Sequence, residues 1–325
     1  MLGTAATLLL VALGAIALAV AVFVLSPARR RKFHIHPEPA IDYPSAVARA
    51  AETFDNSGPE VCDACRGTIL DHGGRTRDAY VLVHGLTNCP VQFRQLADIL
   101  HANGANVLLP RLPYHGFVDR MTPDQARLTA QDLLDSTNAT VDLARGYGER
   151  VIVVGLSASA VAAAWLAQER DDIELAVAIA PFLAPMGFKD PVIHPCANTL
   201  LRLPNAFFWW NGRQKEALVG SPYCYPRFAT HPIGEMMLLG LDLFIRARRN
   251  LPRARKILLV TSPHDVAVSL PRIAELAALW KGRVQAVSFP PTWRIHHDCI
   301  DPSQPGQKVD RVYPQLIAWM DESLN

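Results

Sequence analysis

A serine lies where a buried strand is predicted to turn directly into a helix. Residues 151–154 read Val-Ile-Val-Val, an apolar β-branched run, and an alanine-rich helical stretch follows Ser157. A turn this sharp accepts only small residues two positions before and two positions after the serine, and Gly155 and Ser159 occupy these positions. The turn would lift the Ser157 hydroxyl out of the sheet. The alternative is an ordinary helix N-cap, because serine is favoured there.

Buried strands alternate with helical patterns along most of the chain. The predicted strands cover residues 80–85, 106–110, 151–154, 174–179, 256–261 and 284–289. The predicted helices cover residues 45–54, 93–103, 122–145, the stretch after 157, 271–280 and 309–324. This alternation predicts an α/β fold with a mostly parallel sheet covered by helices on both faces.

The alternation is interrupted at about residues 182–252, a segment rich in proline and aromatic residues. So long an excursion from a compact sheet is typical of a functional insertion. We therefore predict a cap that covers the functional site. The apolar stretch 200–210 could line a pocket for an acyl chain, or its aromatic residues could form the core of the cap itself.

Residues 2–25 are almost wholly apolar, long enough for a helix that crosses a membrane, and Arg29, Arg30, Arg31 and Lys32 follow them. We predict a single-pass membrane anchor over residues 1–28, a basic and proline-rich linker with a short helix over 29–60, and a main domain over 61–325. The positive-inside rule places that domain in the cytoplasm. The alternative is an unusual export signal.

The net charge of +2 and the mixed distribution of charges give no sign of nucleic-acid binding. The pair Cys62 and Cys65 has the spacing of a redox or zinc motif, but no second such pair follows, so we interpret both as reduced structural thiols. His34 and His36 lie beside the basic cluster and are a weak metal signal. We assign no metal and no cofactor.

A serine hydroxyl becomes a strong nucleophile when a histidine, oriented by a carboxylate, removes its proton. Asp265 follows the predicted strand 256–261 and is the candidate acid, although it could merely fix a turn. The loop after strand 284–289 contains His296 and His297. We take His297 as the base and keep His296 as the alternative, because adjacent side chains usually point in different directions.

Negative charge that develops on a substrate oxygen needs hydrogen-bond donors. The backbone N–H of Ala158, directly after the serine, is one candidate. A strand that runs into His84 and Gly85 supplies the second, most simply the backbone N–H of Leu86. The four signals together would arise by chance far less often than any one of them.

On residues 82–90, 110–116, 154–159, 262–265 and 296–298, the chain resembles the α/β-hydrolase superfamily, and within it the esterase and monoacylglycerol-lipase-like group. The resemblance implies an α/β-hydrolase fold, a triad of Ser157, His297 and Asp265, and a mobile cap. The chain departs from the group at Ser159 and Ala160, where Gly-Gly is usual, and at Tyr114, where glycine usually precedes His-Gly. We expect these departures to affect substrate fit more than the triad.

The sequence thus predicts a membrane-anchored hydrolase of small-molecule carboxylic esters, including lipid-derived ones. Two alternatives stay open: a thioesterase or other acyl hydrolase on the same triad, and a non-catalytic hydrolase-like binding module. The oligomeric state stays open as well.

Overall fold

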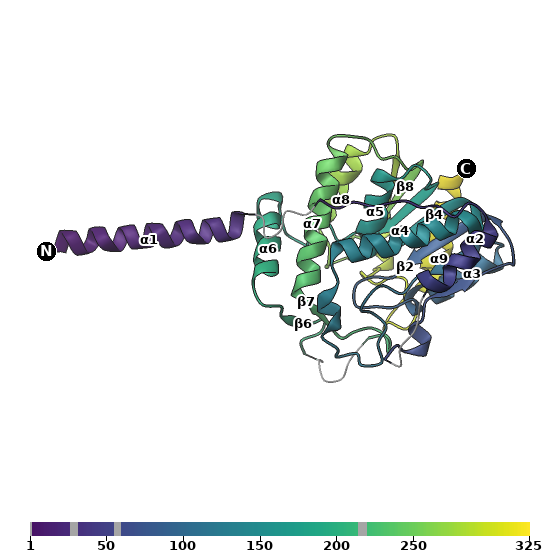
Figure 1. Cartoon of the computed structure of the whole chain (residues 1–325), viewed down its shortest axis with the longest axis horizontal. Helices are drawn as coiled ribbons and strands as arrows, with labels where there is room; N and C mark the ends of the chain where they lie inside the picture. Colours follow the sequence, from purple (N-terminus) through teal and green to yellow (C-terminus); the bar gives the residue numbers. More distant parts are fainter. Residues whose placement is uncertain (1, 27–31, 55–59, 214–219) are drawn as a thin grey trace.

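The computed structural model describes residues 2–26, 32–54, 60–213 and 220–325 (Figure 1). Within these residues the main sheet has seven strands in the order β1-β3-β2-β4-β5-β8-β9. All neighbouring strands are parallel except β1, which runs antiparallel to β3 at one edge. Their bounds are β1 Thr68–Leu70, β2 Thr76–Val83, β3 Asn106–Leu109, β4 Gly148–Leu156, β5 Leu175–Ile179, β8 Lys256–Thr261 and β9 Val284–Ser288.

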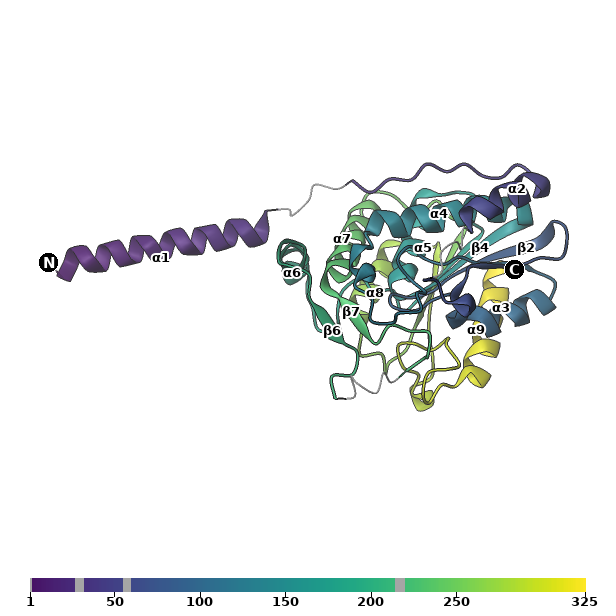
Figure 2. The ribbon, with the colours of Figure 1, turned by 60° about the horizontal axis from the view of Figure 1, so that its bottom comes forward.

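Helices cover both faces of the sheet (Figure 2). On one face lie α4 (Ala130–Tyr147) and α5 (Ala158–Glu169), and on the other lie α3 (Val91–Ala102) and α9 (Val309–Leu324). The central strands are therefore buried on both sides, which explains their continuous apolar sequence. Two further helices are α2 (Tyr43–Thr53), which precedes the domain in the sequence, and α8 (Leu270–Leu279).

The main difference from the predicted helices is at α4, which begins at Ala130 and not at residue 122. Thr129 caps this helix reciprocally with Asp132, so that each side chain accepts a hydrogen bond from the backbone N–H of the other residue. Such a capping box fixes the first turn of a helix. The residues before it form only the short 3₁₀ turn Asp124–Arg127.

The predicted cap contains regular structure that the sequence pattern did not indicate. It comprises α6 (Asp190–Arg202), an antiparallel pair of short strands, β6 (Phe207–Trp209) and β7 (Arg227–Ala229), and α7 (Thr230–Ala247). Two glycines weaken the helical signal of α7, and one of them, Gly240, permits close packing, because an added Cβ would lie 3.1 Å from the carbonyl oxygen of Leu183. Helix α7 packs directly on α5, so it belongs to the core as much as to the cap.

Residues 32–40, which lead to α2, are extended, as expected, but from Phe33 onward they are attached to the domain (Figure 2). The Phe33 side chain is buried, and the carbonyl oxygen of Phe33 accepts a hydrogen bond from Arg246 at 2.8 Å. The backbone N–H of Ala40 donates to the carbonyl oxygen of Asp142 at 2.8 Å. Arg29, Arg30 and Arg31 lie outside the described residues, whereas Lys32 is exposed.

Candidate active site

Ser157 occupies a tight turn between β4 and α5. Its backbone has φ +60° and ψ −112°, a region that residues other than glycine rarely adopt and that is found mainly at functional sites. Gly155 is required here, because an added Cβ would lie 2.4 Å from the carbonyl oxygen of Ser159. The Ser157 side chain makes no capping hydrogen bond to α5. The N-cap interpretation of this serine is therefore not what the structure shows.

The structure brings Ser157, His297 and Asp265 together. His297 Nε2 lies 2.9 Å from Ser157 Oγ, and His297 Nδ1 lies 2.8 Å from Asp265 Oδ2. Because a carboxylate can only accept, Nδ1 carries the proton and Nε2 is free to accept the serine proton. The loops after β8 and β9 supply the acid and the histidine, and the side chain of His296 is exposed.

Asp265 also fixes its own turn, so both interpretations of this residue describe real contacts. Its Oδ1 accepts hydrogen bonds from the backbone N–H groups of Ala267 at 2.8 Å and Val268 at 3.4 Å. These bonds leave Oδ2 directed at His297. The carboxylate is almost completely buried, which protects its hydrogen bond to the imidazole from water.

Leu86 and Ala158 line the same cavity as Ser157 and His297. In the part of the chain that the structure describes, neither backbone N–H donates to a protein acceptor. Both donors therefore remain available to an oxygen atom of a ligand.

Two buried histidines hold the loop that carries Leu86. His84 Nε2 accepts from the N–H of Leu112 at 3.1 Å, and His115 Nε2 accepts from the N–H of Thr87 at 3.3 Å. Burial lowers the pKa of His84 well below its usual value and lowers that of His115 to about 4. Both rings are neutral at physiological pH and act as fixed acceptors.

The three residues that stand where the family usually has glycine do not line the cavity; they are Tyr114, Ser159 and Ala160. Ser159 is buried, and its hydroxyl donates to the carbonyl oxygen of His84, which ties helix α5 to the end of β2. Tyr114 adopts φ +64°, a conformation that glycine would adopt without strain. The structure therefore shows no contact between these residues and the cavity through which they would change substrate fit directly.

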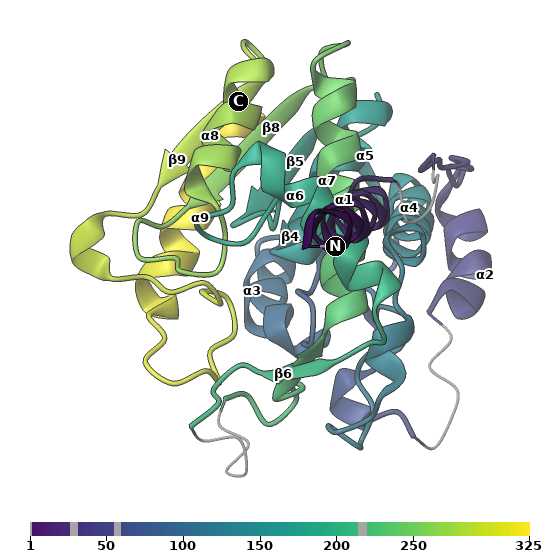
Figure 3. The ribbon, with the colours of Figure 1, turned by 90° about the vertical axis from the view of Figure 1, so that its left-hand side faces the viewer.

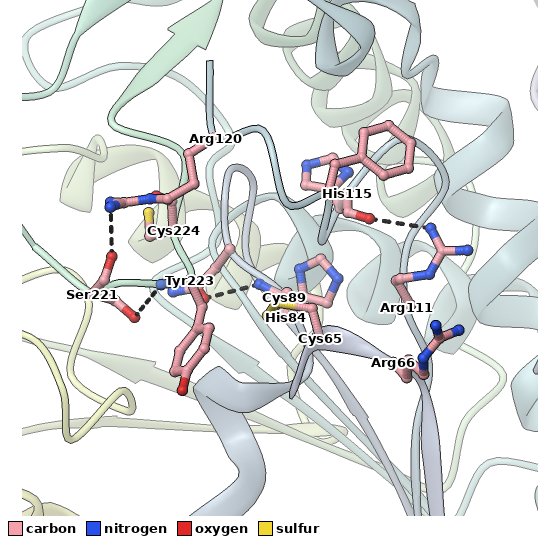
Figure 4. Close-up of a disulfide and its surroundings, with 12 residues drawn as sticks. Cys65, Arg66, His84, Cys89, Arg111, His115, Arg120, Ser221, Tyr223 and Cys224 are labelled. Atoms are coloured by element: carbon pink, nitrogen blue, oxygen red, sulfur yellow. Dashed lines mark hydrogen bonds between the residues drawn. A yellow bond between two sulfur atoms is a disulfide. The ribbon is translucent and has the colours of Figure 1, made fainter. Parts of the chain in front are cut away.

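Cys65 and Cys89 form a disulfide bond, with their Cα atoms 5.4 Å apart (Figure 4). The prediction that Cys62 and Cys65 are both reduced structural thiols is therefore wrong for Cys65, while Cys62 is free. The partner of Cys65 is distant in the sequence, so the local Cys-x-x-Cys spacing gave no indication of the pairing. The bond joins the segment before β1 to the loop after Leu86.

The half-buried Asp298 follows His297 directly in the sequence, and the buried Asp301 donates its backbone N–H to Asp298 at 3.3 Å. Asp298 and Asp301 share the side-chain amide of Asn88, with distances of 3.3 and 3.4 Å from its Nδ2. Burial and the neighbouring Asp301 raise the pKa of Asp298 to about 6. Gln304 donates a further hydrogen bond to Asp298 at 3.2 Å.

A cavity of about 400 Å³ opens above Ser157 between the sheet and the cap. Its apolar wall comes from the cap and the segment that leads into it, with Phe182, Pro185, Trp210, Phe228, Ile233 and Met236. Its polar wall contains Thr87, Asn88, Gln92, Asp298 and Gln304. Of the predicted lining stretch 200–210, only Trp210 reaches this cavity.

A family model described as "Alpha/beta hydrolase family" matches residues 80–316. Among solved structures, a monoacylglycerol lipase of Paleococcus ferrophilus superposes with a TM-score of 0.60 and 16% identity, covering 79% of this chain and 98% of that one. A soluble variant of the monoglyceride lipase of Saccharomyces cerevisiae gives a TM-score of 0.60 and 12% identity, covering 80% and 91%. These structures confirm the predicted fold.

A further structure, described by its authors as that of metagenome-derived lipolytic enzymes, has a TM-score of 0.61 and 19% identity, covering 81% of this chain and 99% of that chain. A curated protein, the dual-specificity RNA methyltransferase RlmN of Syntrophobacter fumaroxidans, is 33% identical over 89 residues. That match covers 27% of this chain and 26% of the methyltransferase, so the chain spans only about a quarter of that protein.

Proposed function

Because the chain belongs to the alpha/beta hydrolase family, we propose that it hydrolyses carboxylic esters with Ser157 as nucleophile, His297 as base and Asp265 as orienting acid. The observation that carries the proposal is the continuous pair of hydrogen bonds, 2.9 Å from Ser157 to His297 and 2.8 Å from His297 to Asp265. The two N–H groups of Leu86 and Ala158 would bind the oxyanion.

In the proposed reaction, His297 Nε2 takes the hydroxyl proton while Ser157 Oγ attacks the ester carbonyl. The resulting oxyanion is stabilised by the two N–H donors, and His297 returns the proton to the departing alcohol. Water, deprotonated by the same histidine, then attacks the acyl-enzyme, which releases the acid and restores the serine hydroxyl. Asp265 keeps its hydrogen bond to Nδ1 and stabilises the imidazolium.

The walls of the cavity support an ester with an apolar acyl group and a polar alcohol. The cap side offers aromatic and aliphatic surface to the acyl group, and the side near Asp298 and Asn88 offers hydrogen-bonding groups to the alcohol. Two of the similar structures are described as lipases of monoacylglycerols, which agrees with a lipid-derived ester as substrate.

We further propose that α1 (Leu2–Leu25) anchors the chain in a membrane with the cap towards the lipid. Among the described residues, Ala6–Leu25 is the one stretch of helix long and apolar enough to cross a bilayer. Helix α1 projects from the domain beside α6 (Figures 1 and 3), and Asn198 of α6 donates to the carbonyl oxygen of Val24 at 3.0 Å. The cap would then face the source of a lipid substrate.

For the division of the chain we propose an anchor over residues 1–28, a connecting segment over 29–60 and a hydrolase domain over 61–325, with the cap at about 182–252.

Two observations disagree about the side of the membrane on which the domain lies. The basic residues 29–32 favour the cytoplasmic side, as the sequence predicts. The Cys65–Cys89 disulfide favours an oxidising compartment, because cytosolic thiols are kept reduced. We propose that the domain lies on the non-cytoplasmic side of the membrane, because both cysteines of the disulfide belong to the folded domain.

The side of the membrane can be tested in intact cells that are quenched with acid and alkylated before lysis. We expect Cys65 and Cys89 to be recovered as one disulfide-linked peptide pair, while Cys299, which is buried and free, is alkylated after denaturation. Recovery of Cys65 and Cys89 in alkylated form would restore the cytoplasmic placement.

A fluorophosphonate probe tests the proposed chemistry. We expect the wild-type protein and the control Ser288→Ala, which changes a serine at the end of β9, to be labelled, and Ser157→Ala to remain unlabelled. Absence of labelling in folded wild-type protein would indicate a non-catalytic binding module. A series of nitrophenyl esters and matched thioesters then separates an esterase from a thioesterase, and activity on only the shortest acyl groups would argue against lipid substrates.

A further inference from the structure

Thr87, the residue directly after Leu86, has an unfavourable backbone conformation. Its φ is +69°, although it is β-branched, and its side chain is buried. A β-branched residue in this region is a true outlier and persists only where its surroundings hold it. Since Thr87 adjoins the proposed oxyanion donor, whatever holds Thr87 also fixes the position of the Leu86 N–H.

Four hydrogen-bond contacts hold Thr87, and three of them come from the cap. The indole N–H of Trp210 donates to Thr87 Oγ1 at 3.0 Å, and the backbone N–H of Tyr225 donates to the Thr87 carbonyl oxygen at 2.7 Å. A longer contact of 3.6 Å joins Thr87 Oγ1 to Cys224 Sγ. The remaining bond runs from the Thr87 N–H to His115 Nε2 at 3.3 Å, within the core domain.

The two cap residues differ in how firmly they are attached. The Tyr225 hydroxyl donates to the carbonyl oxygen of Tyr114 and accepts from the N–H of Phe117, each at 3.2 Å, so Tyr225 is fixed to the core domain. Trp210 is 51% exposed, and it is held within the cap by a bond from its backbone N–H to the carbonyl oxygen of Pro226 at 3.1 Å and by the Phe228 ring, with centroids 4.4 Å apart. Among the described contacts, its one hydrogen bond to the core domain is the bond to Thr87. Trp210 is therefore the partner of Thr87 that moves when the cap moves.

We propose that Thr87 couples the position of the cap to the oxyanion site. When the cap is seated, Trp210 and Tyr225 hold Thr87 in its strained conformation and the Leu86 N–H points at the substrate oxygen. When Trp210 withdraws, Thr87 Oγ1 keeps only the longer contact to Cys224 Sγ, and the loop relaxes away from that position. Trp210 and Thr87 are thus positioning residues, and this proposal rests on the proposed ester hydrolysis with Leu86 as donor.

The first test is Trp210→Phe, which keeps an aromatic ring in the cavity wall and removes the N–H donor. We expect kcat to fall roughly tenfold, a fraction of the loss that follows removal of a whole oxyanion donor, with KM changed less than twofold. Binding of an aryl trifluoromethyl ketone, whose adduct with serine carries an oxyanion, should weaken by the same factor. Trp209→Phe, which changes the neighbouring indole outside the cavity wall, is the matched control and should leave both values unchanged.

A double-mutant cycle separates coupling from simple packing. Thr87→Gly removes the hydroxyl acceptor and tolerates a positive φ, so Trp210→Phe should cost nothing further in that background. An equal loss of kcat in both backgrounds would overturn the proposal, as would a loss confined to KM. Thr87→Val, which keeps the β-branched shape, should reproduce the tenfold loss if Trp210→Phe does not fold.

Failure of the proposed function has a separate signature. If Ser157→Ala retained the activity or the fluorophosphonate labelling, the ester hydrolysis itself would be assigned to the wrong residue. Normal dependence on Ser157 together with an unchanged kcat in Trp210→Phe would remove only the coupling.

Discussion

On one side of Ser157, two side chains from the loops after β8 and β9 account for the proposed proton transfer through two short hydrogen bonds. On the other side, the proposed oxyanion donors are backbone N–H groups, and the loop that carries Leu86 is supported by a disulfide, two buried histidines and the cap. Side-chain chemistry is therefore concentrated on one side, whereas the other side depends on a wide supporting structure.

The largest effect is expected on the proton-transfer side. His297→Gln removes the only acceptor that lies at hydrogen-bond distance from Ser157 Oγ among the described residues, and we expect kcat to fall on the order of 10⁵-fold. His296→Gln is the matched control, because its side chain is exposed, and it should change kcat less than threefold. A loss confined to His296→Gln would make His296 the base and reverse the choice between them. Steady-state hydrolysis of a nitrophenyl ester provides the measurement.

The next prediction concerns the disulfide on the oxyanion side. Cys65→Ser with Cys89→Ser removes a cross-link between residues 24 positions apart, which should lower the free energy of unfolding by about 3–4 kcal/mol. Because Cys89 follows the loop of Leu86, kcat should also fall more than KM rises. Cys196→Ser, a change at a free thiol of α6, is the control. Unchanged kcat in the folded double variant would show that the bond stabilises the domain without positioning the donor.

Asp298 links the two regions: it follows His297 in the sequence and accepts a hydrogen bond from Asn88, which lies in the loop that carries Leu86. Its pKa is raised to about 6 by burial and by Asp301, so the folded state binds its proton more tightly than the unfolded state does. The ionisation of Asp298 therefore destabilises the fold progressively as the pH rises from about 4 to about 6, by at most about 3 kcal/mol above that range.

In Asp298→Asn this pH-dependent loss should disappear. Urea unfolding of the wild type and the variant at pH 4.5 and pH 7.5 provides the measurement, and the stability of the wild type relative to the variant should be lower at the higher pH. An equal difference at both values would mean that Asp298 is ionised throughout, held in that state by its hydrogen-bond donors.

Much of the fold was predictable because buried parallel strands have continuous apolar sequences. The strands β2, β3, β4, β5, β8 and β9 all fall on predicted segments, within a few residues. The short edge strand β1 and the cap strands β6 and β7 were not predicted, because three residues give no periodicity. Helix α7 was missed because its glycines obscure an otherwise amphipathic pattern.

For the candidate site, the sequence indicated the residues that lie beside the cavity but not the residues that support them. Ser157, Asp265 and His297 follow predicted strands, and their spacing in three dimensions follows from the parallel sheet. The contact of Trp210 with Thr87 spans 123 residues and the disulfide spans 24. Such pairings depend on how the cap and the segment before β1 return to the sheet, which no local pattern records.

The smallest effect is expected at Ser159, where helix α5 is hydrogen-bonded to the residue that follows β2. Ser159→Ala removes the hydroxyl that donates to the carbonyl oxygen of His84, and we expect a loss of about 1 kcal/mol in the free energy of unfolding. Ser159→Gly restores the residue usual in similar proteins but should lose about 1 kcal/mol more, because glycine is unfavourable within a helix. Since Ser159 does not line the cavity, KM should stay constant in both variants while kcat falls two- to threefold, roughly in step with the lost hydrogen bond. A changed KM with an unchanged kcat would mean that this departure does act through substrate fit, and that the support of the oxyanion side does not extend to α5.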